Sequence, residues 1–512
     1  MHNIQLSVPT AFGGDPSNMS EHFIARSDAE SDLLACATYI AESIAGGEAR
    51  GEAIASVVPA YLERGNVDLA AELANTVDDP FTRDKLLIAV TEKCAELDDD
   101  EYALQIAEAI EEPGFQAQAF EQIGLVKATK GDLEKARQVA GMMPHPDSVL
   151  VGIAIKQSLN GDPKSGSATI DEIEFSSAAV AALNTIAGAK ISTDEKDAAP
   201  ELLERSLTRA VEIEHDEERI RAYCEIGNLF HEAGRSAKAI ETFEKARVDA
   251  ERVSNVYRDT LLGQVSLGFL TAGSIELADR TLDAVGDKTQ IASVVLGFAR
   301  DHWRKNEKEE AIEALEEAYA ILRSQKDFET RDSKSKFALM GSIAAQFAGF
   351  EKRERGLEVS EAIEDEAQRA SALATVAAIA AAQRDDAISR EALDAISEPI
   401  DGVFARIGMS DSVSNTDTVL ASELLVRAER RTDDISQLGP KADALLEIGK
   451  RRIRSGETDG LQSLVSKILE IASNMRSERG VVKTLAQLAD VTESAGLKLS
   501  DADEERLRGM LS

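Results

Sequence analysis

The sequence predicts an all-α protein built from repeated pairs of helices. Hydrophobic residues make up 43% of the 512 residues and aromatic residues only 4%, so the interior consists mainly of Ala, Leu, Ile and Val. No sustained run alternates apolar and polar residues, as strands would require. A chain this long exceeds the ~250–300 residues at which single cores stop growing, so it divides into domains or extends as repeats. Turn residues at Gly65, Asp98 and Gly131, spaced by 33 residues, favour repeats.

The stretch from Arg221 to Ala246 shows the repeat unit most clearly. Large residues recur at spacings of three and four along a predicted first helix, at Tyr223, Ile226 and Phe230. This helix is expected to end at Gly234, where a residue free to adopt a positive φ is needed. A second helix is indicated by residues that recur at i, i+4 and i+7, at Ala239, Phe243 and Ala246.

This order of residues resembles the tetratricopeptide repeat, in which a large residue, Leu-Gly, Tyr, Ala, Phe and Ala follow one another at fixed spacings. Weaker copies extend the resemblance over most of residues 31–500. It implies a right-handed α-solenoid of about a dozen stacked antiparallel helix pairs. Backbones in such a stack approach closely only where the crossing residues are small, and the expected crossing residues are Gly227, Ala239 and Ala246.

Four segments are expected along the chain. They are a mobile arm at 1–30, helical repeats at 31–192, tetratricopeptide-like repeats at 193–410, and further helical repeats with a capping helix at 411–512. The capping helix is predicted from LSDADEERLRGML, which offers Ser500 or Asp501 as N-cap and acidic residues in the first turn. Two stretches that match the repeat poorly, 161–198 and 397–440, are expected to alter the curvature of the solenoid.

The charge of the chain limits its partners. A formal charge of −36 opposes any role that neutralises phosphates on DNA, RNA or an anionic membrane, so neither nucleic acid nor membrane is an expected partner. The most apolar stretch, 372–382, is shorter than the ~20 residues that cross a bilayer. The acidic composition also suits a cytoplasm of high salt, although ordinary bacterial solenoids share it.

The three cysteines argue for a reducing, cytoplasmic location. Cys36, Cys94 and Cys224 are odd in number and widely spaced, which leaves neither a disulfide framework nor a CxxC metal site.

Signatures of catalysis are missing from the sequence, which contains no phosphate-binding loop, HExxH or GxSxG. The acidic runs HDEE at 215–218 and DDDE at 98–101 are better explained by helix starts than by metal binding. Cys224 and His231 stand seven residues apart, about 10.5 Å along a helix, and cannot share a proton directly. We therefore expect no enzyme, no cofactor and no metal.

Candidate partner-binding residues follow from the resemblance, because the first helix of each repeat in that family lines a concave groove. The predicted groove residues are Arg221, Asn228, His231, Arg300, Trp303, Arg304, Lys450 and Arg454. Arg and Trp are frequent interface anchors, and cations on an acidic chain suit an acidic or carboxylate-bearing peptide. In the alternative interpretation the cations pair with nearby acids or lie in solvent, and Trp303 packs between repeats.

Together these features predict a non-enzymatic scaffold or adaptor that binds protein or peptide partners on its concave groove. The alternative is a regulatory solenoid that senses a ligand or peptide and changes curvature to control an output partner. The oligomeric state is left open.

Overall fold

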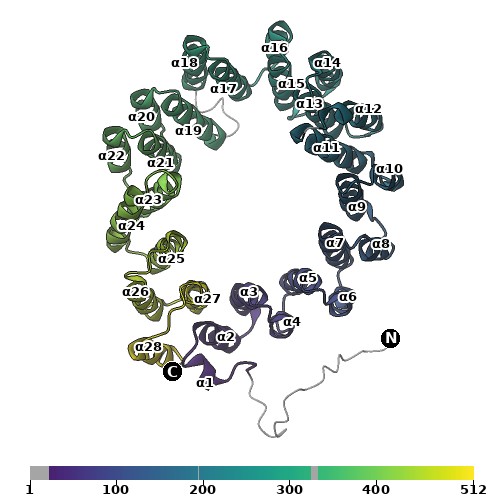
Figure 1. Ribbon diagram of the computed structural model, residues 1–512. Helices are drawn as coiled ribbons and strands as arrows, with labels where there is room; N and C mark the ends of the chain where they lie inside the picture. The colour runs from purple at the N-terminus through teal and green to yellow at the C-terminus, as the bar shows by residue number, and fades with distance from the viewer. Residues whose placement is uncertain (1–21, 194, 325–332, 512) are drawn as a thin grey trace. The chain divides into compact units, whose positions relative to one another are not determined.

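The computed structural model describes residues 22–193, 195–324 and 333–511, and every regular element in these ranges is helical (Figure 1). The prediction of an all-α solenoid of helix pairs is confirmed. Of the arm expected at 1–30, residues 1–21 lie outside the described ranges. Arg26–Ala29 form the single helical turn α1, and Ala29 is buried.

The chain forms two compact units, one made of the residues up to Lys93 together with those from Ile453 onward, the other of Cys94–Arg452. The segment boundaries predicted at residues 193 and 411 remain predictions, because this division does not test them. The first unit contains α1 (Arg26–Ala29), α2 (Leu33–Ser43), α3 (Gly47–Glu63), α4 (Val67–Asn75), most of α5 (Pro80–Glu96), the end of α25 (Leu438–Ser455), α26 (Leu461–Ser473), α27 (Glu478–Ser494) and α28 (Asp501–Met510).

Both ends of the chain pack together in this first unit. Helix α27 lies against α2 and α3. Ion pairs reinforce the contact, at 2.6 Å between Arg64 and Glu493 and at 2.6 Å between Arg479 and Glu52.

The predicted C-terminal capping helix is present as α28. Ser500 is its N-cap and forms a capping box with Asp503, and α28 packs on α26.

The second unit is a stack of helix pairs. It contains the end of α5, then α6 (Asp100–Ala109), α7 (Pro113–Lys130), α8 (Leu133–Ala140), α9 (Asp147–Leu159), α10 (Pro163–Glu172), α11 (Ser176–Ser192), η1 (Lys196–Ala198), α12 (Ala199–Ala210), α13 (Asp216–Glu232), α14 (Ser236–Arg252), α15 (Arg258–Thr271), α16 (Ile275–Leu282), α17 (Lys288–Arg304), α18 (Lys308–Ser324), α19 (Ser333–Gly349), α20 (Arg353–Glu361), α21 (Glu366–Ala382), α22 (Asp386–Asp394), α23 (Pro399–Val413), α24 (Thr418–Arg431), η3 (Thr432–Asp434) and most of α25.

Helices of this unit form two layers. The odd-numbered helices from α7 to α23 are the first helices of the pairs, and each packs against the next first helix. The second helices pack on their own first helix, and most also reach the first helix of the following pair. The stretches 161–198 and 397–440, which match the repeat poorly, nevertheless fold into helices of the same two layers, with the short 3₁₀ turns η1 and η3 beside them.

The acidic runs start helices, as expected. Asp99 is the N-cap of α6 and accepts a hydrogen bond from the Tyr102 amide at 3.3 Å. Asp98, just before it, has a φ of 64°, the left-handed conformation that Gly131 and Gly234 adopt at the equivalent turns of their repeats. The run at 215–218 supplies the acidic first turn of α13.

The packing of Phe243 on α14 shows why small residues are needed where successive repeats meet. Its ring is fully buried and meets the ring of Phe269 on α15 edge-on, with centroids 5.8 Å apart. A Cβ on Gly227 of α13 would lie 2.6 Å from Phe243 Cε1, and one on Gly268 of α15 would lie 2.4 Å from the same atom. Both glycines are therefore needed to admit the ring between successive first helices. The predicted crossing residues Ala239 and Ala246 are also fully buried.

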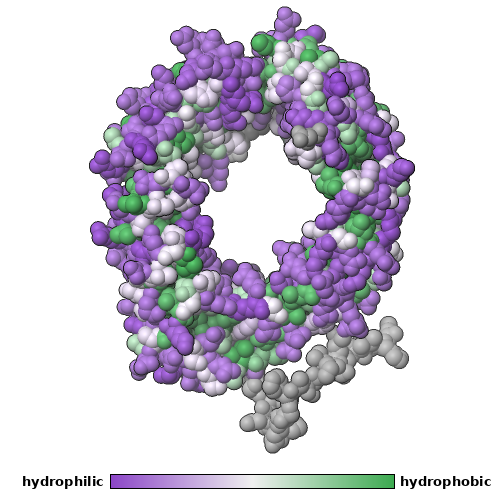
Figure 2. Space-filling view, viewed as in Figure 1, coloured by the Kyte–Doolittle hydropathy of each residue, from purple (hydrophilic) through white to green (hydrophobic). Residues whose placement is uncertain are grey.

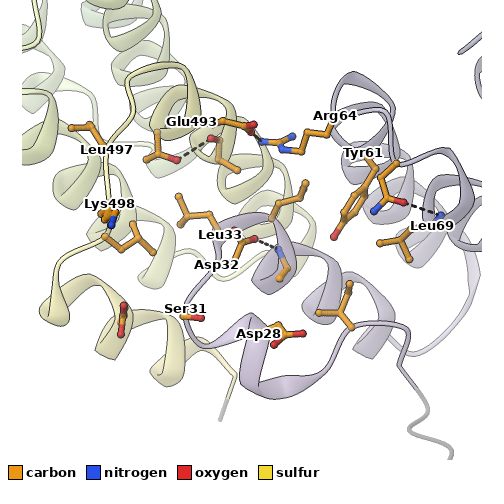
Figure 3. Close-up of a pocket in the computed structure, with 18 residues that line it drawn as sticks. Asp28, Ser31, Asp32, Leu33, Tyr61, Arg64, Leu69, Glu493, Leu497 and Lys498 are labelled. Carbon is orange, nitrogen blue, oxygen red and sulfur yellow. Dashed lines mark hydrogen bonds and ion pairs between the residues drawn. The ribbon is translucent and has the colours of Figure 1, made fainter. Parts of the chain in front are cut away.

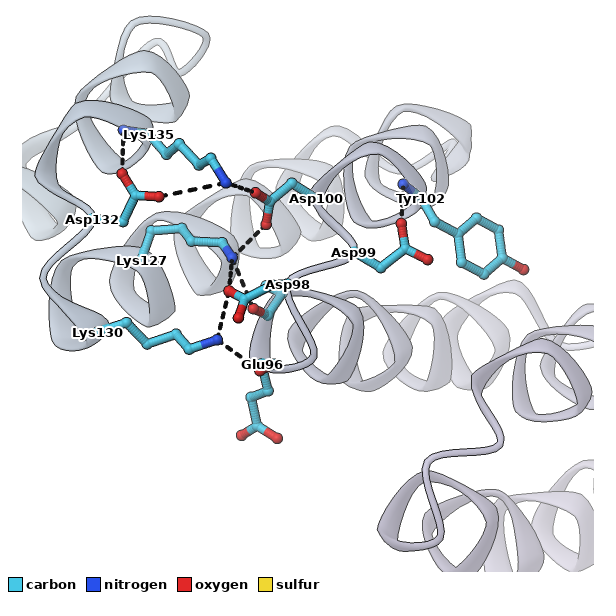
Figure 4. A network of polar contacts seen from close by, with 10 residues as sticks. Glu96, Asp98, Asp99, Asp100, Tyr102, Lys127, Lys130, Asp132 and Lys135 are labelled. Atoms are coloured by element: carbon cyan, nitrogen blue, oxygen red, sulfur yellow. Dashed lines mark hydrogen bonds and ion pairs between the residues drawn. The ribbon is translucent and has the colours of Figure 1, made fainter.

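In α7 a lysine replaces the aromatic residue of this core. Lys127 occupies the position that Phe230 and Phe269 hold in their repeats, and it is only 1% exposed. Its Nζ donates hydrogen bonds to the Ala95 carbonyl and to Asp98 Oδ1, both at 2.9 Å, and it pairs with Asp100 (Figure 4). The Lys127 ammonium group thus links the turn between α5 and α6 to α7, the first helix of the following pair.

Lys130 shares this network. Its Nζ lies 2.6 Å from Asp98 Oδ1. The hydrogen bonds from Lys130 and Lys127 lower the pKa of Asp98 to about 2.

We expect Gly268→Ala to lower the free energy of unfolding by about 1–3 kcal/mol, because the added methyl group overlaps the Phe243 ring. Urea denaturation followed by circular dichroism measures the change. The matched control is Gly408→Ala on α23, where a Cβ meets nothing within 4 Å. There alanine should stabilise the helix by ~0.5–1 kcal/mol. Equal effects of the two substitutions would contradict the crossing described for Phe243.

The network around Lys127 predicts a pH dependence. The folded pKa of Asp98, about 2, lies below the ordinary value of about 3.9. Its stabilising contribution is therefore fully present above pH ~4 and is lost as the pH falls towards 2. Asp98→Asn should lower stability near neutral pH, and the difference from the native chain should shrink between pH 4 and 2. Glu134→Gln, which changes an exposed carboxylate that forms no ion pair or hydrogen bond with other described residues, should give no such pH-dependent difference.

Candidate functional site

The predicted groove residues of α13 are partly accessible. Arg221 and Asn228 are exposed, lie two turns apart on one face of the helix, and form no hydrogen bond or ion pair with other described residues. The His231 ring is half-buried, with Nδ1 3.3 Å from Ser236 Oγ. Cys224 lies at helical spacing from Arg221 and Asn228, which would place it on the same predicted groove. It is buried instead, and burial raises the pKa of its thiol to about 12.

On α17 the three predicted residues differ in their surroundings. Arg300 is exposed and forms no hydrogen bond or ion pair within the described part of the chain. Trp303 is half-buried: its ring stacks on Phe350 with centroids 4.3 Å apart, and Lys308 Nζ lies 4.8 Å from the ring centroid. Arg304 donates a hydrogen bond to Asp301 at 3.1 Å. These contacts favour a packing role for Trp303 and leave Arg300 as the most available of the three.

The basic run on α25 is largely neutralised by neighbouring acids. Lys450 pairs with Glu447 at 3.0 Å. The adjacent Arg451 pairs with Glu447 and, at 2.9 Å, with Asp411. Arg454 is exposed and has no such pair among the described residues.

The layer of first helices brings part of this set together. Helices α13, α15 and α17 pack side by side, so Arg221 on α13 and Arg300 on α17 belong to the two helices that flank α15. On α15 itself, the uncharged residues Gln264 and Leu267 are exposed and half-buried, respectively. Neither residue was predicted from the sequence. Applying the repeat spacing of α13 to α15 would have identified Leu267.

A cavity of about 770 Å³ lies in the first unit, between the helices of the two chain ends (Figure 3). Asp28, Asp32 and Lys498 contribute charged groups to its wall, and Leu33 and Leu497 contribute apolar surface. Arg64 is held at its edge by Glu493. This cavity could not be predicted from the sequence, because its walls come from segments more than 400 residues apart along the chain.

Burial raises the pKa of the Cys36 thiol to about 12, as it does for Cys224, so neither thiol is activated as a nucleophile. In the described ranges no three His, Cys, Asp or Glu side chains gather as metal ligands do. No helix of the described chain is long and apolar enough to span a bilayer.

Comparison with known proteins identifies one stretch of the chain. The tetratricopeptide repeat family matches residues 220–246, the pair α13–α14 that encloses Phe243. No curated protein matches the sequence.

The solved structures that match this chain have low overall similarity to it. One is Ton1535 from Thermococcus onnurineus NA1, with 15% identity and a TM-score of 0.25 over 69% of this chain and 97% of that one. Another is a STAND signal-transduction ATPase with a tetratricopeptide repeat sensor from Pyrococcus horikoshii, with 12% identity and a TM-score of 0.27 over 62% and 54% of the chains. A third is the quorum sensor NprR from B. thuringiensis, with 11% identity and a TM-score of 0.25 over 67% and 97%.

The family match falls on the unit in which Tyr223, Gly227, Phe243 and Ala246 form the repeat core, and helix pairs of the same layered design precede and follow it. The chain is therefore an α-solenoid of helix pairs, and its pair α13–α14 matches the tetratricopeptide repeat family.

Proposed function

We propose that this protein is a non-enzymatic adaptor that binds a protein or peptide partner on the layer formed by its first helices. The observation that carries the proposal is the pair of exposed arginines, Arg221 on α13 and Arg300 on α17, the two first helices that pack on either side of α15. Neither guanidinium group is engaged by another described residue, although Arg221 has Glu218 and Glu225 at helical spacing.

The chemistry of this surface indicates the kind of partner. A guanidinium group forms paired hydrogen bonds with a carboxylate, so Arg221 and Arg300 suit a segment that presents acidic side chains or a C-terminal carboxylate. The exposed Asn228 amide adds hydrogen bonding to backbone groups. Because the helices are fixed by packing, binding on this layer avoids most of the ordering cost that a flexible surface would carry. The buried thiols suit a reducing cytoplasm, where we propose that the protein works.

A double substitution tests this surface. A partner is first captured from native extract with the full-length chain, then purified and titrated by calorimetry. Arg221→Ala with Arg300→Ala should weaken binding about tenfold or more, since each arginine anchor contributes more than ~1 kcal/mol.

The matched control is Arg235→Ala with Arg280→Ala, which removes two exposed arginines outside the first helices that form no ion pair with the described residues. This control should leave affinity within about twofold of the native chain. Similar losses in both variants would mean that net charge, and not the first-helix layer, determines binding.

The alternative, a ligand-sensing solenoid, draws support from the cavity in the first unit. A ligand bound there would touch α1–α4 from one end of the chain and α27–α28 from the other, and so would stabilise their contact. In this case the protein purified from its source should retain a small molecule or peptide, detectable by native mass spectrometry. Lys498→Glu in the cavity wall should reduce that retention, whereas Lys196→Glu on an exposed turn should not. Absence of any retained molecule, or its retention in the Lys498→Glu variant, would count against a sensor of this kind.

A further inference from the structure

Connections between consecutive repeats form a second surface in the second unit. We call the turn ridge the four connections that join α8 to α9, α10 to α11, α12 to α13 and α14 to α15, comprising residues 142–147, 173–176, 211–217 and 253–257.

Hydrogen bonds place these connections side by side. Asp147 Oδ2 accepts from the Phe175 amide at 2.7 Å, which joins the first connection to the second. Ser176 Oγ donates to Glu212 Oε2 at 3.0 Å, joining the second to the third. Asn255 Nδ2 donates to Glu217 Oε1 at 2.6 Å, joining the third to the fourth. The turn ridge is therefore continuous over four repeats.

Large apolar side chains are exposed along this ridge. The exposed fractions are 53% for Phe175, 60% for Val211, 67% for Val256 and 48% for Tyr257. The His145 ring lies beside Phe175, with centroids 6.0 Å apart. Single exposed apolar residues are normal on a protein surface, but a row of them on adjoining turns marks an interaction site.

Carboxylates without partners lie among these apolar groups. Glu174 and Glu214 are exposed and form no side-chain hydrogen bond or ion pair with the described residues. A surface hollow of about 540 Å³ beside Tyr257 is lined by His215, Asp216, Glu217, Glu218, Arg252, Val253, Ser254 and Asn255. Three of these lining residues are acidic, against one arginine. That arginine, Arg252, lies 3.6 Å from Asp249.

We propose that the turn ridge binds a basic amphipathic helix of a partner protein. Apolar side chains of such a helix would cover Phe175, Val211 and Val256, and its lysines or arginines would pair with the unpartnered glutamates. Cations would also lie favourably over the exposed rings of Phe175 and Tyr257. This surface is separate from the first-helix layer, and it selects the opposite charge from that expected at Arg221 and Arg300.

A synthetic helix of Leu and Lys with apolar residues on one face tests the proposal. Fluorescence anisotropy with the full-length chain should show binding of this helix and little binding of a Leu and Glu helix with the same pattern. The triple variant Phe175→Ser, Val211→Ser and Tyr257→Ser should weaken binding about tenfold or more. Phe175 and Tyr257 are N-cap residues, a position that serine favours, so the helices should be retained, and far-UV circular dichroism verifies this.

The matched control changes three other exposed apolar residues, Leu97→Ser, Leu159→Ser and Ile275→Ser, which lie at turns inside repeats. It should leave binding within about twofold of the native chain. Equal losses in the two triple variants, full binding in the ridge variant, or no binding of the Leu and Lys helix would overturn the proposal. The Arg221→Ala and Arg300→Ala variant should bind this helix normally, so failure here is distinguishable from failure of the proposed function.

Discussion

The close approach of successive first helices around a buried side chain is the constraint on which this architecture depends. In the clearest repeat, the Phe243 ring enters between α13 and α15 only because Gly227 and Gly268 have no Cβ. A single pair of helices cannot cover its own apolar face, so each repeat is completed by its neighbour. The first helices thereby form a continuous layer, and the accessible residues of α13, α15 and α17 share one surface.

Much of the fold was predictable from sequence because the constraint recurs at a fixed period. The spacing of Tyr223, Phe230 and Phe243 identified the helix pair, and Gly234 marked the turn between its helices. Lys127 was not predicted as a core residue, because a lysine departs from the apolar pattern. Its burial depends on Asp98 and Asp100, which a turn of the preceding repeat brings close. Such a pairing is set by stacking and leaves no periodic signal.

The candidate site was predictable to a smaller extent. The spacing of Arg221 and Asn228 puts them on one face of α13, since helical spacing fixes which residues share a face, and both are exposed; their part in partner binding stays a prediction. It did not show that Cys224 would be covered or that Trp303 would stack on Phe350, because both depend on residues from other helices. The turn ridge was likewise not predictable from the sequence, where Phe175, Val211 and Val256 stand 36 and then 45 positions apart and match no periodic motif.

The packing of α27 against α2 and α3 affects how the protein unfolds. In an ordinary linear array each terminal repeat has a neighbour on one side only, so fraying starts at the ends and proceeds inward. Here α27 packs against α2 and α3, and the ion pair between Arg64 and Glu493 joins the two ends of the chain at this contact. Unfolding that starts from either of these described helical ends would have to separate α27 from α2 and α3 first, a cost that a linear array does not have.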